Sequence, residues 1–291
     1  MGYALTFAGD VDGDGLDDLL LGARYLDAAG SNAGGAYLVE GPVSGLASLS
    51  SATARLLGVA SSDQAGSAVG GAGDVDGDGL ADLLVGAPEA SVGASGDGCV
   101  YLIAGGASGD VSLADASTRL IGDRSGDAAG SWLGGPADLD GDGLDDLIVG
   151  AEGSAVAYLV LAPAAGDVAL GDAYATLSAV GLGASTSGAT VGDVDVDGSL
   201  DIVVGYELDS AGGTYAGAVR LLLGPFEGVV DVASPDALLL GEVSGGKAGH
   251  AVAGGGDLNA DGYSDFAIGA FNESSGGSLA GAAYLILGGG Y

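Results

Sequence analysis

Short apolar runs alternate with glycine-rich polar segments along the whole chain. The runs are about four to six residues long and rich in Val, Ile, Leu and Tyr, which favours β-strands over helices. Residues 66–129 show the order best, with a small-residue strand at 66–73 and apolar strands at 83–88, 99–104 and 118–122. A helical solenoid would need longer runs at 3.6-residue spacing, and the sequence shows none.

This order of segments recurs five times, and each copy carries an acidic stretch between its first two strands. The stretches begin at Asp10, Asp74, Asp138, Asp193 and Asp257, and are therefore 64, 64, 55 and 64 residues apart. We place the repeats at about 2–65, 66–129, 130–184, 185–248 and 249–291. Periods of this length indicate solenoids, propellers or arrays.

Four short strands in each repeat are typical of the blade of a β-propeller. We count 19 strands, four in each of the first four repeats and three in the last, which lacks a fourth strand. The sequence therefore predicts an all-β protein with a single β-propeller domain over residues 1–291, built from five blades. A Tyr recurs in four of the five third strands, and we attribute it to packing.

The acidic stretches carry oxygen side chains at positions 1, 3, 5 and 9, as in 74–82, which reads DVDGDGLAD. Four carboxylates this close repel one another unless a cation is bound, and Ca²⁺ is the hard, oxygen-seeking cation that suits them. Position 12 is apolar in all five copies, whereas an EF-hand has a bidentate Glu there, so we expect a calcium loop in a β-hairpin. The alternative is an acidic turn without metal.

The predicted ligands are the side chains at positions 1, 3, 5 and 9 and the backbone carbonyl at position 7. They are Asp10, Asp12, Asp14, Leu16 and Asp18; Asp74, Asp76, Asp78, Leu80 and Asp82; Asp138, Asp140, Asp142, Leu144 and Asp146; Asp193, Asp195, Asp197, Ser199 and Asp201; and Asp257, Asn259, Asp261, Tyr263 and Asp265. Up to five Ca²⁺ ions are expected. Loops four and five should bind most weakly, because Val196 stands where the others have Gly or Ala and Asn259 replaces an Asp.

The chain is strongly acidic, with 40 acids against 6 bases and a formal net charge of −34. Such a surface repels nucleic acid and anionic membranes, so we expect neither as a partner. No apolar stretch approaches the ~18 residues of a membrane span. The first residues also lack the basic and apolar regions of a signal peptide.

The sequence offers little for catalysis. His250 is the only histidine and Cys99 the only cysteine, so a nucleophile–base pair of the usual kind is not expected. We interpret Cys99 as a buried thiol, His250 as a surface or packing residue, and Trp132 as core or rim. The chain is therefore predicted not to be an enzyme.

The repeat resembles the FG-GAP repeat of the integrin alpha-subunit propeller. The acidic loops carry the resemblance, together with a Gly-Ala-Pro after the second strand that is intact at 86–88 and shortened to Gly-Ala at 22–23, 150–151 and 269–270. The Phe that opens the family's repeat is absent. The resemblance implies a seven-bladed ring with calcium in the strand 1–2 hairpins and ligand-binding loops on the opposite face, so this chain is either five-bladed or part of such a ring.

Two functions compete. The first is a non-enzymatic calcium-binding scaffold for extracellular protein or glycan interaction or adhesion, acting through loops such as 27–34, 89–97 and 207–214. The alternative is an accessory propeller domain of a secreted enzyme whose catalytic domain lies outside this chain. An extracellular or cell-surface location follows from the resemblance and from loops suited to millimolar Ca²⁺; without a signal peptide, the chain would be a fragment of a longer protein.

Overall fold

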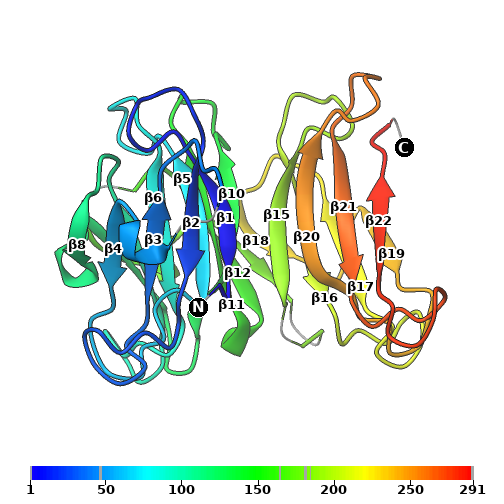
Figure 1. The fold of residues 1–291 in the computed structure, drawn as a ribbon. Helices are drawn as coiled ribbons and strands as arrows, with labels where there is room; N and C mark the ends of the chain where they lie inside the picture. Colours follow the sequence, from blue (N-terminus) through cyan, green and yellow to red (C-terminus); the bar gives the residue numbers. More distant parts are fainter. Residues whose placement is uncertain (1, 46–47, 164, 180–181, 184, 290–291) are drawn as a thin grey trace. The chain divides into compact units, whose positions relative to one another are not determined.

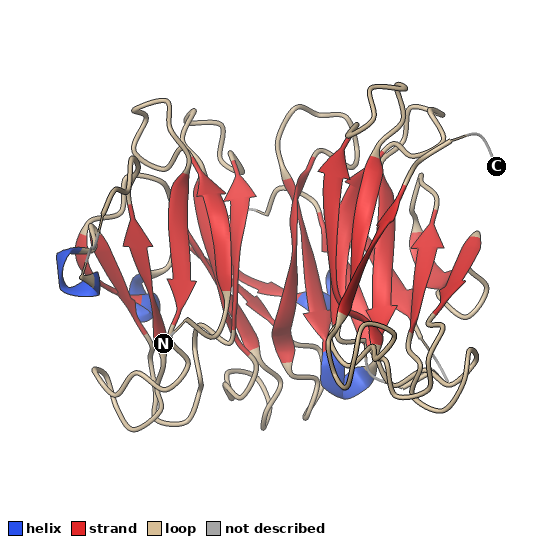
Figure 2. Cartoon of the chain, turned by 45° about the vertical axis from the view of Figure 1, so that its right-hand side comes forward, coloured by secondary structure: helices blue, strands red, loops and turns tan. Residues whose placement is uncertain are grey.

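A computed structural model describes residues 2–45, 48–163, 165–179, 182–183 and 185–289 of the chain. These residues form strands joined by loops, with 3₁₀ helices of three residues each (Figure 2). In this part of the chain, no helix has the length and apolar character needed to cross a membrane. The predicted all-β class is confirmed. The predicted boundaries at Met1, Ala184 and Tyr291 lie outside the described residues.

The chain forms two compact units, Met1–Ser154 with Tyr158–Ala173, and Ala155–Ala157 with Tyr174–Tyr291. The division falls within the third repeat. The strands of both units make five sheets of three to five strands each, as expected of propeller blades (Figure 1). The single domain over residues 1–291 stays a prediction.

The first unit contains two complete sheets and part of a third repeat. The first sheet has the order β1 (Leu5–Gly9), β2 (Asp18–Gly22), β3 (Gly35–Val39), β4 (Ala54–Leu57) and β8 (Gly109–Ser112). The second contains β5 (Ala68–Gly73), β6 (Asp82–Ala87), β7 (Cys99–Ile103), β9 (Thr118–Ile121) and β13 (Gly166–Ala169). The third repeat contributes β10 (Ala129–Ala137), β11 (Asp146–Ala151) and β12 (Val156–Val160). The 3₁₀ helices are η1 (Leu49–Ser51), η2 (Leu113–Asp115), η3 (Glu152–Ser154) and η4 (Leu170–Asp172).

The second unit contains the fourth and fifth sheets. The fourth has the order β15 (Ser187–Gly192), β16 (Asp201–Tyr206), β17 (Ala218–Leu222) and β19 (Ala237–Leu240). The fifth has the order β20 (Ala248–Gly256), β21 (Asp265–Ala270) and β22 (Ala282–Ile286), so the described last blade has three strands, as predicted. The unit also holds β14 (Ala175–Ser178) paired with β18 (Gly228–Asp231).

The predicted count of 19 strands is wrong, because the described residues contain 22. The additional strands are β8, β13 and β18, which lie in the connection after the third strand of a repeat. Each pairs in parallel with the fourth strand of the preceding repeat, β8 with β4, β13 with β9 and β18 with β14. We refer to these three as donated strands. Arg55 forms a two-pronged ion pair with Asp110 across the first of these pairings, and Arg119 does the same with Asp167 at 2.7 Å.

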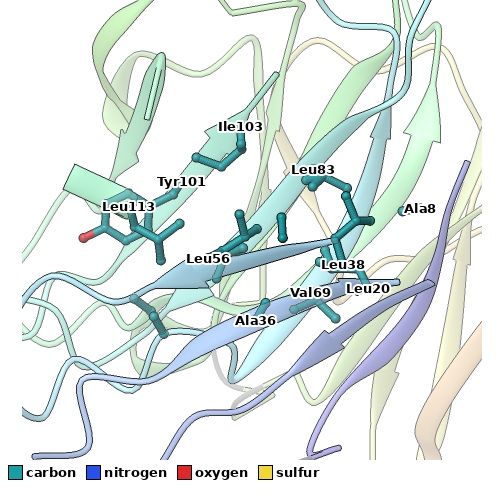
Figure 3. Packing of buried hydrophobic residues seen from close by; sticks show 14 of the residues in the cluster. Ala8, Leu20, Ala36, Leu38, Leu56, Val69, Leu83, Tyr101, Ile103 and Leu113 are labelled. Carbon is teal, nitrogen blue, oxygen red and sulfur yellow. The ribbon is translucent and has the colours of Figure 1, made fainter. Parts of the chain in front are cut away.

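The core of the first unit lies between its first two sheets (Figure 3). Leu20, Leu38 and Leu83 have no exposed surface and belong to the same buried cluster as Tyr101, which is 2% exposed. Removing apolar surface from water in such a cluster stabilises the fold by about 25 cal/mol for each Å² that is buried. The packing role predicted for the recurrent Tyr is confirmed at this position.

The glycine near the end of the second strand has a steric reason. A Cβ on Gly86 would overlap the carbonyl oxygen of Gly130, and a Cβ on Gly22 would overlap that of Gly66. Glycine therefore allows the second strand of one blade to lie against the backbone that begins the next. This close approach accounts for the glycine at positions 22 and 86, whereas a Cβ on Gly150 would instead overlap the Trp132 ring.

Candidate metal centres

Each acidic loop is a tight turn built around its first aspartate. In loop one, Asp10 Oδ1 accepts hydrogen bonds from the N–H of Gly13 at 2.8 Å and of Asp14 at 3.0 Å, and Oδ2 accepts from Gly15 at 2.9 Å. Gly13 and Gly15 both have left-handed backbones, with φ of 81° and 86°, a conformation that glycine adopts without a steric penalty. The Asp-Gly spacing in the sequence therefore encodes the turn.

The acids at positions 3 and 5 extend the turn by accepting hydrogen bonds from backbone N–H groups two residues further along. In loop two, Asp76 Oδ1 accepts from the N–H of Asp78 at 3.1 Å, and Asp78 Oδ1 accepts from that of Leu80 at 2.9 Å. Since the backbone holds these side chains on the inside of the turn, their carboxylates converge. The same bonds at position 5 recur in all five loops.

Four loops bring three carboxylates together with ligand oxygens within 4.8 Å of one another. In loops one and three the three come from positions 1, 3 and 9, and in loops two and four from positions 1, 3 and 5. The sets are Asp10, Asp12 and Asp18; Asp74, Asp76 and Asp78; Asp138, Asp140 and Asp146; and Asp193, Asp195 and Asp197. Hard cations such as Ca²⁺ are held by oxygen ligands of this kind.

Loop five differs in its third position. The Asn259 amide nitrogen donates to Asp261 Oδ2 at 2.8 Å, so one carboxylate oxygen of the loop is already hydrogen-bonded to a neighbouring side chain. At its predicted ligand positions the loop also has one negative charge fewer than the others. Metal binding by the residues of all five loops, including the carbonyls at position 7, stays a prediction.

The aspartate at position 9 has a second role that the sequence did not suggest. Asp82 is 1% exposed, and its Oδ2 accepts from the N–H of Val75 at 3.1 Å while Oδ1 accepts from Gly105 at 2.9 Å. Gly105 lies just beyond the third strand, so one carboxylate joins the acidic loop to a distant part of its own blade. The equivalent bonds are made by Asp18 to Gly41, Asp146 to Ala162, Asp201 to Gly224 and Asp265 to Gly288. We call these five residues the brace aspartates.

Burial changes the proton affinity of three of the brace aspartates. Removal from water disfavours the carboxylate and raises the pKa of Asp82 to about 6, although its two backbone hydrogen bonds act in the opposite direction. Burial likewise raises the pKa of Asp146 and of Asp201. A cation beside these groups would favour their charged form.

Loops four and five carry backbone strain at position 4. Val196 has φ of 60° and Ala260 has φ of 60°, where the other loops have glycine. A β-branched residue is strongly disfavoured in this left-handed region. The structure thus supplies a conformational reason for expecting loop four to be weaker than the first three.

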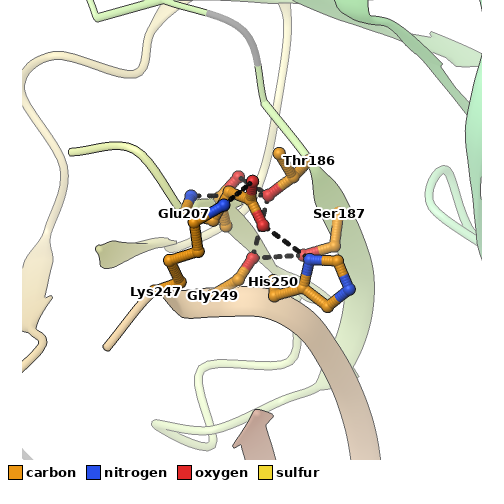
Figure 4. Close-up of polar contacts among 7 residues, drawn as sticks. Thr186, Ser187, Glu207, Lys247, Gly249 and His250 are labelled. Atoms are coloured by element: carbon orange, nitrogen blue, oxygen red, sulfur yellow. Dashed lines mark hydrogen bonds and ion pairs between the residues drawn. The ribbon is translucent and has the colours of Figure 1, made fainter. Parts of the chain in front are cut away.

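The opposite end of the fourth blade carries a charged cluster (Figure 4). Glu207 follows β16 and accepts from Lys247 Nζ at 3.0 Å, and its other oxygen lies 2.6 Å from His250 Nδ1. Burial raises the pKa of Glu207, but the hydrogen bonds from Lys247 and His250 outweigh it, so the pKa lies below its usual value. The Ser187 hydroxyl donates to the Gly249 carbonyl at 2.9 Å, so it is not arranged as a nucleophile activated by His250.

The other residues singled out from the sequence fall where packing predicts. Cys99 is fully buried, and burial raises the pKa of its thiol to about 12, which suits an inert core residue. Trp132 is 6% exposed and packs over Gly150. His250 is exposed and lies against Phe271, with ring centroids 4.4 Å apart and the ring planes tilted by 53°. The absence of catalysis stays a prediction.

The loop at 89–97, predicted as a ligand-binding loop, is organised by its own last residue. Asp97 is fully buried and accepts from the N–H groups of Val92 at 3.0 Å, Gly93 at 2.6 Å and Ala94 at 2.5 Å. Its carboxylate is therefore committed to the loop. Among the exposed residues of this loop, Val92 is the large apolar one, at 37% exposed.

Comparisons with known proteins agree with this geometry. The family model for the FG-GAP repeat matches residues 1–39 and 65–103. Integrin alpha-PS5 of Drosophila melanogaster is 34% identical over 164 residues, covering 54% of this chain and 15% of the relative. Integrin alpha-IIb of Mus musculus is 36% identical over 152 residues, covering 50% of this chain and 14% of the relative. Integrin alpha-5 of Xenopus laevis is 35% identical over 161 residues, with coverages of 52% and 15%.

The chain spans about 15% of the length of these curated relatives. The similarity therefore concerns the repeats and leaves the remainder of each relative unmatched. Both matched segments contain an acidic loop and the second strand that follows it, 10–22 and 74–87. The resemblance seen in the sequence is confirmed: the chain carries FG-GAP repeats, the blades of a β-propeller fold, and is similar to integrin alpha subunits.

Proposed function

We propose that this chain is a non-enzymatic, calcium-binding β-propeller scaffold that binds a protein or glycan partner outside the cell or at its surface. One observation carries the calcium assignment. In four separate loops, backbone hydrogen bonds hold three carboxylates with oxygens within 4.8 Å of one another. Turns that serve only for solubility gain nothing from such convergence, because like charges this close repel.

Calcium suits these loops better than magnesium. Ca²⁺ accepts six to eight oxygens in flexible geometry, whereas Mg²⁺ demands a near-ideal octahedron and retains its waters. Each of the first four loops offers four carboxylates and a carbonyl, a crowded and highly charged set. Up to five ions would bind, most weakly in loops four and five.

Exposed apolar side chains support the interaction role. The loops between the second and third strands carry large residues that are more than a third exposed: Tyr25, Val92, Leu208, Tyr215, Phe271 and Leu279. These loops leave the blades at the end opposite the acidic loops. Aromatic residues at such positions are typical of protein interfaces, and the similarity to integrin alpha subunits agrees with an adhesive role.

Thermal unfolding of the purified chain tests the calcium assignment. A Ca²⁺-specific rise in melting temperature is expected between excess EGTA and millimolar Ca²⁺, since a ligand of the folded state stabilises it by mass action. Mg²⁺ and a NaCl series of equal ionic strength separate specific binding from charge screening. Asp76→Asn should diminish the rise, whereas Asp115→Asn, which removes an exposed acid outside the loops, should leave it unchanged.

Equal melting temperatures in EGTA and Ca²⁺ would refute the calcium assignment, and the acids would then be turn formers. The interaction role is tested separately, by presenting the Ca²⁺-loaded chain to arrays of glycans and extracellular proteins. Binding should depend on the exposed apolar residues, so Tyr215→Ser should weaken it while the melting temperature stays the same. Binding that ignores these residues would contradict the assigned surface.

A further inference from the structure

The acidic loops of neighbouring blades are hydrogen-bonded to one another through the backbone. In the first unit, the N–H of Ala81, at position 8 of loop two, donates to the carbonyl of Asp10, at position 1 of loop one, at 2.9 Å. In the second unit, the N–H of Ser264 in loop five donates in the same way to the carbonyl of Asp193 in loop four, at 3.2 Å. Since each loop turns around its position 1, this bond joins the turn of one loop to the next.

A second path connects the brace aspartates of neighbouring loops. Asp82 of loop two accepts from the N–H of Gly105 at 2.9 Å. The next residue, Gly106, donates to the carbonyl of Val11 in loop one at 2.8 Å. The Val11 N–H in turn donates to Asp18, the brace aspartate of loop one, at 2.9 Å. Two predicted metal ligands from different loops are thus connected by a continuous series of hydrogen bonds.

The second unit contains the same path between loops five and four. The brace aspartate of loop five, Asp265, accepts from Gly288 at 2.9 Å. Gly289 then donates to the carbonyl of Val194 at 3.1 Å, and the Val194 N–H donates to Asp201, the brace aspartate of loop four, at 2.8 Å. The arrangement therefore recurs wherever a residue with an N–H group follows the donor to the brace aspartate.

Loops two and three are joined differently. Pro163 follows Ala162, the donor to the brace aspartate Asp146, and proline has no N–H to give to loop two. The carboxylate of Asp145, at position 8 of loop three, accepts instead from the N–H of Asp74 in loop two at 3.1 Å. The Asp145 N–H also donates to the Asp74 carbonyl, at 3.4 Å. The link between these two loops therefore runs through Asp145.

We propose that neighbouring acidic loops open and close together, so that the state of one loop is passed to the next in the series one, two and three and in the pair four and five. Opening one loop displaces the backbone that carries these acceptors, so its neighbour loses the hydrogen bonds that end on it. Elements coupled in this way change each other's equilibria by the same factor. The coupling itself needs no metal. Its consequence, that Ca²⁺ in one loop favours Ca²⁺ in its neighbour, rests on the proposed function.

Charge alone predicts the opposite sign of coupling. A cation bound in one loop lowers the negative potential at the next loop and so weakens binding there, an effect that salt screens. The hydrogen-bonded paths act in the other direction, because a filled loop holds its carbonyl acceptors in place for its neighbour. The sign of the coupling therefore identifies its cause. Loops four and five, which are expected to bind most weakly, would support each other.

Hydrogen exchange of the full chain in excess EGTA tests the coupling without metal. Asp257→Ala removes the acceptor of two backbone N–H groups and so loosens the turn of loop five. The reporters lie in loop four, where the N–H groups of Asp197 and Gly198 donate to Asp193. They should exchange about two- to tenfold faster in the variant, the range set by the net stability of one hydrogen bond.

Two controls separate local opening from loss of the fold. The amides of β16 and the matching amides of loop one, Asp14 and Gly15, should keep their wild-type exchange rates in Asp257→Ala. If the β16 amides lose protection, Asp257→Asn retains one acceptor oxygen and provides the milder form of the same test. Loop-four amides that exchange at the wild-type rate while loop five is loosened would overturn the proposal.

A second variant removes the path and leaves every acid in place. Gly289→Pro deletes the N–H that donates to Val194. Proline already stands at the matching position of three other repeats, as Pro42, Pro163 and Pro225. Added to Asp257→Ala, this substitution should reduce the effect on the loop-four amides by at least about half. An effect that Gly289→Pro leaves unchanged would show that the path does not carry the coupling.

Titration with Ca²⁺, followed at the same amides, tests the consequence for metal binding. Loops four and five should fill together, over a narrower concentration range than independent sites give, and Gly289→Pro should broaden that range. Filling of one loop that weakens the other, the sign predicted by charge alone, would overturn the proposal. A chain in which no loop responds to Ca²⁺ would refute the proposed function, and the exchange rates in EGTA would then decide the coupling by themselves.

Discussion

The brace aspartates should stabilise the blades even without metal, and a pair of matched substitutions can show this. Asp82→Asn and Asp76→Asn each remove one negative charge from the same loop. Asp76 is exposed and accepts one hydrogen bond through an oxygen that Asn retains, whereas Asp82 is 1% exposed and uses both oxygens. Only Asp82→Asn therefore deprives a backbone N–H of its hydrogen-bond acceptor.

The magnitude follows from the hydrogen bonds. In Asp82→Asn one oxygen becomes an NH₂ group, which faces the N–H of either Val75 or Gly105 and leaves that buried donor unpaired. An unsatisfied buried donor costs about 1–3 kcal/mol. A surface change such as Asp76→Asn stays within about 0.5 kcal/mol. For a chain of this size, each kcal/mol lowers the melting temperature by about 2–4 °C.

Unfolding followed by circular dichroism, in excess EGTA and in millimolar Ca²⁺, distinguishes the two roles. In EGTA only Asp82→Asn should melt below the wild type. In Ca²⁺ both variants should melt lower, because both residues are proposed ligands. If Asp82→Asn and the wild type melted together in EGTA, the bracing role would be refuted and the residue would matter only through the metal.

Three further outcomes are expected. The pKa of Glu207 is lowered, so its contribution to the free energy of unfolding is present above its usual pKa of 4.5 and is lost as the pH falls through the lowered pKa. Glu207→Gln should lower the free energy of unfolding by about 1–2 kcal/mol at neutral pH, because the bond to Lys247 is lost. In strong acid the substitution should change nothing. Val196→Gly should raise stability by about 1 kcal/mol by relieving a left-handed valine, and an unchanged melting temperature would contradict the strain. Gly150→Ala should displace the Trp132 ring, destabilising the chain by about 1–3 kcal/mol and shifting its fluorescence to the red; an unaltered spectrum would contradict that packing.

Much of this fold could be predicted from spacing. Short apolar runs that alternate with Gly-rich turns, four in each of the first four repeats and three in the last, predict blades. The Asp and Gly positions of 74–82 predict a specific turn. The donated strands could not be found in this way. They are four residues long, half or more of each is exposed, and their partners lie far away in sequence, as Arg55 and Asp110 are 55 residues apart. No local pattern reports such a pairing.

The candidate metal centres could likewise be predicted only in part from the sequence. Converging carboxylates at positions 1, 3 and 5 follow from the sequence, because the turn itself turns them inward. The second role of the aspartate at position 9, as a buried acceptor of backbone hydrogen bonds, could not be predicted. A metal ligand and a buried acceptor both require a carboxylate, so the residue type does not distinguish the two roles. One signal was present: Gly41, Gly105, Gly224 and Gly288 each lie 23 residues beyond a brace aspartate, just past a third strand. A recurrent glycine at a fixed offset can mark a backbone donor.

Because of the donated strands, the repeat in the sequence and the blade in the structure have different boundaries. The first blade is complete only when residues 109–112 have been made, well inside the second repeat. During synthesis on a ribosome, the fourth strand of a blade would stay unpaired on its outer side until the donated strand of the next repeat had been made. A duplication or deletion of one whole repeat among the second to fourth would keep this pairing intact, because each of these three brings both a fourth strand and a donated strand. A cut at a repeat boundary would break it, so shortened versions of the chain are best ended after a donated strand.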